Sequence, residues 1–424
     1  MQITPKNISH KIYWRQILEE LFITIILPPF IGLPRLISNA MKIKRDDKTK
    51  YFTYIICISA IVATIISTKP PTGDQISYSM AYQAVPQQGF IGSLINIYGY
   101  IHNYEMPKNA ISVEFMNGVY NYIGYYLTFG YYPLFLFLYF TIEFSLIGIG
   151  LYHYLRNIKK PTVPIVSGMM ILLFFYLFFI MCSQLQKQYL GQAIMMYVLG
   201  CYADYGRMNK KLWMITVISI FTHQSMLLFV PFLLFKPFRQ KLTKKSQIAL
   251  AGLIFAFIAV GPNMAGKITN STNYNESSAL TYGINRFSTA GIQTDELTMN
   301  VIQFTVVCIP MLYILLKKLW IERKKISAHA TYMLNISLLL IVVIIAMRPM
   351  PLLQYRYFNT TFAFLPFIYP FMFSTVSNRD HFLKVIGFFM LFILMATISS
   401  TGRAYAPLFN LICEPPILLI AGLF

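Results

Sequence analysis

The sequence predicts an all-α, polytopic integral membrane protein, and three observations support this fold class. Of the 424 residues, 56% are hydrophobic and only 12% are charged, whereas a soluble domain carries about 25% charged residues. Apolar runs of membrane-spanning length recur from residue 51 onward. Strand-length alternation of apolar and polar residues is absent, which argues against a membrane β-barrel.

The apolar runs define the predicted membrane segments. Those long enough to cross are 51–68, 131–155, 162–182, 189–204, 247–264, 299–316, 328–347, 357–374 and 384–399. An earlier run, 17–38, contains Pro28, Pro29 and Pro34, so we expect it to be kinked or partly interfacial. Together with residues 212–235, these runs predict about 10–12 membrane segments in a single domain, 1–424.

The net charge of +20 is concentrated in short basic clusters between the apolar runs. The clusters fall within 42–50, 156–160, 207–211, 236–245 and 317–325. Basic residues gather in cytoplasmic loops of membrane proteins, so we expect all of these clusters to be cytoplasmic. This distribution explains most of the charge without a nucleic-acid partner.

Residues 212–235 are predicted to be a re-entrant hairpin. They form the only apolar run between the clusters at 207–211 and 236–245, and a single crossing would place the later clusters outside. About 11 helical residues from Leu212 onward would reach ~17 Å, a little past mid-bilayer, with the tip near His223. Pro231 is compatible with a broken helix.

The same alternation predicts which segments face the outside. They are 69–118, 183–188, 265–298, 348–356 and the tail from residue 400. The first is a long extracytoplasmic loop expected to carry interfacial helices, and 265–298 is a second long loop. Loops of this length are often functional.

Several polar residues on the predicted outer face are candidates for a site. Asp74 opens a polar segment, with Tyr78 one helical turn later; the alternative is that Asp74 caps an interfacial helix. Gln184, Lys187 and Gln188 crowd a short turn, which indicates a hydrated, hydrogen-bonding pocket.

Arginines on this face run against the charge bias. Arg348, Arg356 and Arg403 each carry a planar fork of donors that matches phosphate oxygens, so several converging there would bind a diphosphate. The alternative is ion pairing with outer carboxylates such as Asp295 or Glu296. Glu143 lies inside the predicted span 131–155, where an ionisable residue is functional by default or else a neutral or paired structural glutamate.

We expect neither a metal nor a cofactor. The five cysteines lie in or beside apolar runs, and no two have the spacing of metal ligands or of a redox pair. No P-loop and no Rossmann glycine pattern is present.

The order of the polar motifs resembles that of the EpsG/Wzy-type polysaccharide polymerases. Asp74 with Tyr78 is followed by KQYL at 187–190, THQS at 222–225 and YRYFN at 355–359. The resemblance covers roughly residues 51–375 and is strongest over 182–235. It implies roles for Asp74, Tyr78, Gln188, His223, Ser225 and Arg356. This chain has Lys187 where the family usually has arginine, so a bidentate fork is lost there.

The family resemblance implies a GT-C-like helical bundle in a bacterial inner membrane. The expected reaction at its outer face transfers a growing glycan from undecaprenyl diphosphate to a sugar hydroxyl of a repeat unit on the same carrier. Such an enzyme would serve O-antigen, lipopolysaccharide or exopolysaccharide biosynthesis. Expected partners are that lipid-linked oligosaccharide, membrane lipids, a chain-length regulator and a flippase.

The attacking hydroxyl needs one general base, for which His223, Asp74 and Glu143 are candidates. Imidazole near its usual pKa suits neutral pH, which favours His223. The sequence leaves two other functions open: a lipid-linked glycan flippase or transporter, and another lipid-linked glycosyltransferase or ligase. A transporter usually shows inverted repeats between its halves, and the sequence shows none.

Overall fold

The computed structural model describes most of the chain's central part. The described residues are 48–67, 74–95, 114–156, 185–271, 301–348, 351–372 and 414–421, with scattered residues in 15–40, at 71 and in 165–171. Within these residues the regular structure is helical and no strand occurs, which confirms the all-α fold class.

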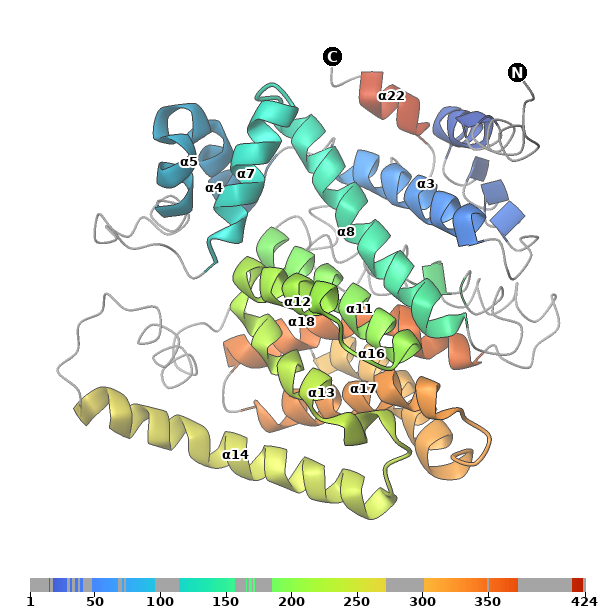
Figure 1. The fold of residues 1–424 in the computed structure, drawn as a ribbon, viewed down its shortest axis with the longest axis vertical. Helices are drawn as coiled ribbons and strands as arrows, with labels where there is room; N and C mark the ends of the chain where they lie inside the picture. The colour runs from blue at the N-terminus through green and yellow to red at the C-terminus, as the bar shows by residue number, and fades with distance from the viewer. Residues whose placement is uncertain are drawn as a thin grey trace.

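The helices are named as in Figure 1. In chain order they are α3 (Lys48–Ser67), α4 (Asp74–Gln83), α5 (Val85–Ile95), α7 (Met116–Leu127), α8 (Tyr132–Leu155), α11 (Gln186–Tyr205), α12 (Lys210–Thr222), η2 (Gln224–Phe229), α13 (Val230–Leu234), η3 (Lys236–Arg239), α14 (Lys244–Ser271), α16 (Val301–Leu316), η5 (Lys317–Ile321), α17 (Ala328–Ala346), α18 (Pro351–Ile368), η6 (Tyr369–Met372) and α22 (Pro416–Ala421).

Three described helices are long and apolar enough to cross a membrane: Tyr132–Leu155, Val301–Ile321 and Ala328–Ala346. They coincide with predicted spans, so the chain is a membrane protein with several spanning helices. The total of about 10–12 segments stays a prediction, because 384–399 and most of 17–38 and 162–182 lie outside the described residues. Helix α14 continues to Ser271, into the segment predicted to be the second outer loop.

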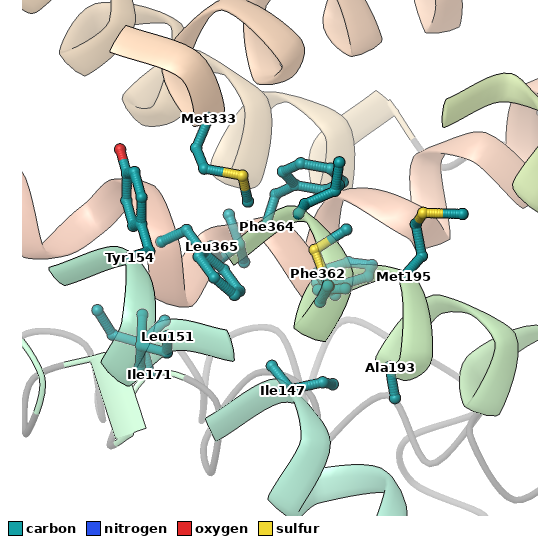
Figure 2. Packing of buried hydrophobic residues seen from close by; sticks show 14 of the residues in the cluster. Ile147, Leu151, Tyr154, Ile171, Ala193, Met195, Met333, Phe362, Phe364 and Leu365 are labelled. Atoms are coloured by element: carbon teal, nitrogen blue, oxygen red, sulfur yellow. The ribbon is translucent and has the colours of Figure 1, made fainter. Parts of the chain in front are cut away.

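Helix α8 runs through the middle of the fold and packs against α3 and α11 (Figure 1). Two glycines bring α8 and α11 close together: a Cβ atom on Gly200 would overlap the backbone of Gly150. Small residues allow such close approach of helices in membranes. Figure 2 shows α8, α11, α17 and α18 contributing Leu151, Met195, Met333 and others to one apolar core.

Three short helices, α4, α5 and α7, gather at the end of α8 where that helix begins (Figure 1). A tight turn with Gly130 at φ 76° joins α7 to α8. Tyr82 of α4 holds this turn, because its hydroxyl bonds Thr128 Oγ1 at 2.5 Å and its ring lies 4.8 Å from that of Phe135. At 10–12 residues each, these helices reach about 18 Å at most, too little to cross a bilayer.

Residues 206–239 fold back on themselves as a hairpin. Helix α12 begins with an N-cap at Asn209 and ends where His223 adopts an extended backbone, with φ −154° and ψ 125°. The chain then returns through η2 and α13, and the Arg239 guanidinium donates to the carbonyl of Gly206. The two ends of the segment therefore meet, as expected of a re-entrant hairpin.

The hairpin packs between α11 and α17. On the outgoing side, Ser219 Oγ donates to the carbonyl of Gly191 at 2.8 Å. On the return side, Tyr332 Oη donates to the carbonyl of Phe232 at 3.1 Å. The tip thus lies about one and a half turns from the N-terminal end of α11. The break at the tip comes from His223, whereas Pro231 stands in the first turn of α13.

A cysteine at Gln240 tests the topology of the hairpin. Gln240 is exposed just after η3, and we expect Gln240→Cys to resist a membrane-impermeant maleimide added outside intact cells and to react once the membrane is permeabilised. The background is a chain whose five native cysteines have been replaced. The control is Gln87→Cys, exposed on α5, which should react from outside. Equal labelling of both positions from outside would show that 212–235 crosses the membrane.

Candidate functional site

The start of α7 docks onto the tip of the hairpin. Asn117 Nδ2 donates to the carbonyl of Thr222 at 2.9 Å. The hydroxyl of Tyr120 bonds Thr222 Oγ1 at 2.9 Å. The rings of Phe115 and Phe221 pack with centroids 4.8 Å apart. This contact joins segments about a hundred residues apart in sequence and places Glu114, just before α7, beside the tip.

Donors from two other elements converge on the Glu114 carboxylate. Lys187 Nζ, in the first turn of α11, lies 3.0 Å from Oε2. The backbone N–H of Gln224 donates to Oε1 at 3.3 Å, and Nε2 of His223 lies 3.7 Å from the same oxygen. Glu114 is only 4% exposed and Lys187 only 7%. The carboxylate therefore has a compensating charge on one oxygen and polar contacts on the other.

Glu114 remains ionised at this position, which belongs to the predicted outer segment. Burial alone would raise its pKa, but Lys187, His223 and the N–H of Gln224 together lower the pKa to about 2. Because the pKa of the folded state lies below that of the unfolded chain, the carboxylate stabilises the fold above its ordinary pKa. That stabilisation is lost as the pH falls toward the lowered value.

Ser225 holds the imidazole of His223 at Nδ1, and Nε2 of the ring faces Glu114. Its Nδ1 accepts a hydrogen bond from the backbone N–H of Ser225 at 3.3 Å, and Ser225 Oγ lies 2.6 Å from the same nitrogen. A nitrogen that accepts from an N–H has no proton of its own. The neutral ring therefore carries its proton on Nε2, which faces Glu114.

Tyr78 of α4 lies among the charged groups of this site. Its ring centroid is 6.0 Å from Lys187 Nζ, and the side chain is buried. Burial is the largest cause of the raised pKa of Tyr78. Asp74 and Glu114 raise the pKa further, and Arg356 lowers it. Two further predicted site residues, Asp74 and Arg356, therefore lie within electrostatic reach of Tyr78, with Asp74 exposed at the start of α4.

Two glutamines set the position of α18 against α11. Gln188 Nε2 donates to the carbonyl of Arg356 at 3.1 Å. One turn later, Gln192 Nε2 donates to Thr360 Oγ1 at 2.9 Å. These bonds hold Arg356 at the level of Gln188, which is the residue after Lys187.

Four further residues were predicted for the site: Glu143, Arg348, Gln184 and Arg403. Glu143 is fully buried in the middle of α8, one turn beyond Tyr139, whose hydroxyl donates to the carbonyl of Gln186 at 3.0 Å. Arg348 is exposed after the C-terminal end of α17, and among the described residues its side chain has no hydrogen bond to the cluster. Gln184 and Arg403 lie outside the described residues.

Glu114 is a residue of the site that was not predicted from the sequence. The acidic residues of segment 69–118 are Asp74, Glu105 and Glu114, and an acid in an outer loop near a basic turn is a signal that could have selected it. Periodicity gave no reason to choose among the three. In the described part of the chain, no group of His, Cys, Asp and Glu could hold a metal ion.

Comparison with known proteins identifies one family. The model of the EpsG family matches residues 90–410, which include Glu114, Lys187, His223 and Arg356 but not Asp74. No curated protein matches the chain, and no solved structure matches it.

Removing the ion partner of Glu114 should destabilise the protein. Lys187→Met leaves a buried carboxylate without its cation, and we expect a loss of about 3–5 kcal/mol, as for one partner of a buried ion pair. The measurement is the midpoint of thermal unfolding in detergent. The double variant Lys187→Met/Glu114→Gln, which leaves no buried charge, should recover part of the loss. A single variant as stable as the wild type would contradict this account of the cluster.

Proposed function

This chain belongs to the EpsG family, and from that premise we propose that it is a polysaccharide polymerase. It would transfer a growing glycan from undecaprenyl diphosphate to a sugar hydroxyl of an undecaprenyl-diphosphate-linked repeat unit. The reaction would take place at the outer face of a bacterial inner membrane. One observation carries the proposal: a cation, a histidine and a serine meet where the start of α7 docks on the hairpin tip.

The leaving group of this reaction is a diphosphate, which needs charge stabilisation more than protonation. Lys187 lies beside the tip, and Gln188, the next residue of α11, holds the backbone of Arg356 close to it. Arg356 is also within electrostatic reach of Tyr78. We assign the diphosphate to the side chains of Lys187 and Arg356. Arg348 and Arg403 are further candidates for its outer oxygens, and Tyr78, Gln184 and Gln188 would line the same pocket.

The attacking sugar hydroxyl must lose a proton. His223 is the best candidate for the base, because its ring lies at the hairpin tip and is 14% exposed, beside a fixed carboxylate. Asp74 is exposed at the start of α4, so its carboxylate is less confined than the ring of His223. Glu143 is fully buried in the middle of α8, so a sugar hydroxyl reaches it less readily than it reaches His223.

The surrounding membrane would supply both substrates. The lipid tails of donor and acceptor would lie between helices, while the glycans would extend from the outer face. A flippase would deliver the lipid-linked repeat unit, and a chain-length regulator would limit the polymer. The product would enter O-antigen, lipopolysaccharide or exopolysaccharide synthesis.

Polymerisation by purified protein tests this function. Protein incubated with the lipid-linked repeat unit of the producing bacterium should give a ladder of glycans on a gel. Arg356→Ala should lower the rate at least about 10²-fold, the loss typical of removing a group that stabilises developing charge. His223→Ala should lower the rate by a similar factor.

The matched control is Arg207→Ala, which removes one exposed arginine from a predicted cytoplasmic cluster and should leave the rate unchanged. Translocation of the lipid-linked unit across vesicles without any ladder would contradict the polymerase and favour a flippase. Normal ladders from both site variants would show that the site lies elsewhere.

A further inference from the structure

We propose that the base acts through Ser225: the acceptor hydroxyl gives its proton to Ser225 Oγ, and Ser225 gives its own proton to Nδ1 of His223. Glu114 faces the opposite ring nitrogen, with its Oε1 3.7 Å from Nε2. This inference rests on the proposed polymerase function and assigns Ser225 as a catalytic residue and Glu114 as a positioning residue. The family resemblance implies a role for Ser225 without saying which, and it does not point to Glu114.

The position of the proton on the neutral His223 ring determines which nitrogen can accept the proton of the substrate. Nδ1 accepts from the backbone N–H of Ser225, so it carries the lone pair, and Nε2 carries the proton that faces Glu114. A proton arriving at the ring must therefore bind at Nδ1. Within the described residues, the hydroxyl placed for this transfer is Ser225 Oγ, at 2.6 Å.

The backbone at the hairpin tip builds this arrangement. The extended conformation of His223 ends α12 and makes the residue the N-cap of η2. Its ring consequently folds back over the first turn of η2, where Ser225 supplies both the N–H and the hydroxyl. The docked start of α7 presents Glu114 to the other side of the ring.

Accessibility separates Glu114 from the other two residues of the relay. Ser225 and His223 are both partly exposed, the His223 side chain at 14%, whereas the Glu114 side chain is 6% exposed. A substrate hydroxyl can therefore approach Ser225 beside the ring. Glu114 is too deep to touch the substrate, which is why its role is to position the imidazole.

The charges support a proton on the ring. Once Nδ1 is protonated, the imidazolium faces an ionised carboxylate 3.7 Å away. Lys187 keeps that carboxylate ionised, so Glu114 stabilises the imidazolium without taking its proton.

The atoms and charges of the step balance. The acceptor oxygen forms a bond to the anomeric carbon, and the bond from that carbon to the diphosphate oxygen breaks. The electron pair leaves with undecaprenyl diphosphate, while the proton of the acceptor ends on His223 through exchange at Ser225. The ring later returns that proton through Ser225 to water.

Variants of Ser225 test the relay. Ser225→Ala should lower kcat about 10²-fold, the lower end of general-base contributions, while KM for the lipid-linked acceptor and binding of undecaprenyl diphosphate stay unchanged. Ser225→Thr keeps a hydroxyl and should restore most of the rate. The control is Ser246→Ala, which loses only a hydroxyl contact to Thr243 and should match the wild type.

Glu114 is tested by Glu114→Gln, which keeps the shape and loses the charge. We expect kcat to fall at least about tenfold, with partial rescue by Glu114→Asp. Thermal unfolding of each variant checks that the fold is kept, and Ser225→Ala provides the test even if Glu114→Gln fails to fold.

Three results would overturn the relay. Ser225→Ala could polymerise at the wild-type rate, or it could lose lipid binding and turnover in equal measure, which would make Ser225 a binding residue only. The third is a wild-type chain that makes no polymer from its repeat unit. That result is distinct from the other two, because it would overturn the proposed function and the relay with it.

Discussion

A buried carboxylate organises this protein. Glu114 cannot stay ionised away from water without compensation, because an uncompensated buried charge costs several kcal/mol. Its partners come from α11 and from the hairpin tip, and Lys187 and Gln224 are 73 and 110 residues away in sequence. Pairing the Glu114 carboxylate with its partners therefore requires α7, α11 and the hairpin to pack in one relative position. A shift of any of these elements would leave a charge or a polar group unpaired.

Helix α11 makes most of the other contacts that position the site. Its first turn supplies Lys187 to the carboxylate, its next residue, Gln188, holds the backbone of α18, and Gly191 receives the hairpin tip. At the other end of the hairpin, Arg239 closes the return onto Gly206, just after α11 ends. The tip of the hairpin is thus anchored near the N-terminal end of α11, and its base is anchored just after the C-terminal end of the same helix. Contacts with α11 therefore position the tip although its backbone leaves the helical conformation.

The hairpin tip brings two kinds of chemical group close together: cations and a proton acceptor. The cations Lys187 and Arg356 suit a diphosphate that leaves with negative charge, whereas His223 and Ser225 suit a hydroxyl that must lose a proton. Glu114 lies between the two groups and contacts both. A lysine at position 187 serves this geometry, because its flexible ammonium reaches Glu114 without the planar alignment that an arginine fork requires.

The sequence by itself determined the class of the protein and much of the site's membership. Apolar length, charge alternation and local motifs are properties of the chain read in order, so they predicted the helical membrane fold, the reversal at 212–235 and residues such as Lys187, His223 and Ser225. Only the tertiary structure decided that Glu114 is the common partner of Lys187 and His223, that Nδ1 of His223 faces Ser225, and that Glu143 is fully buried in α8. The reason is that a charge pair between residues 73 positions apart leaves no local pattern. Its partners become neighbours only when α7, α11 and the hairpin pack together.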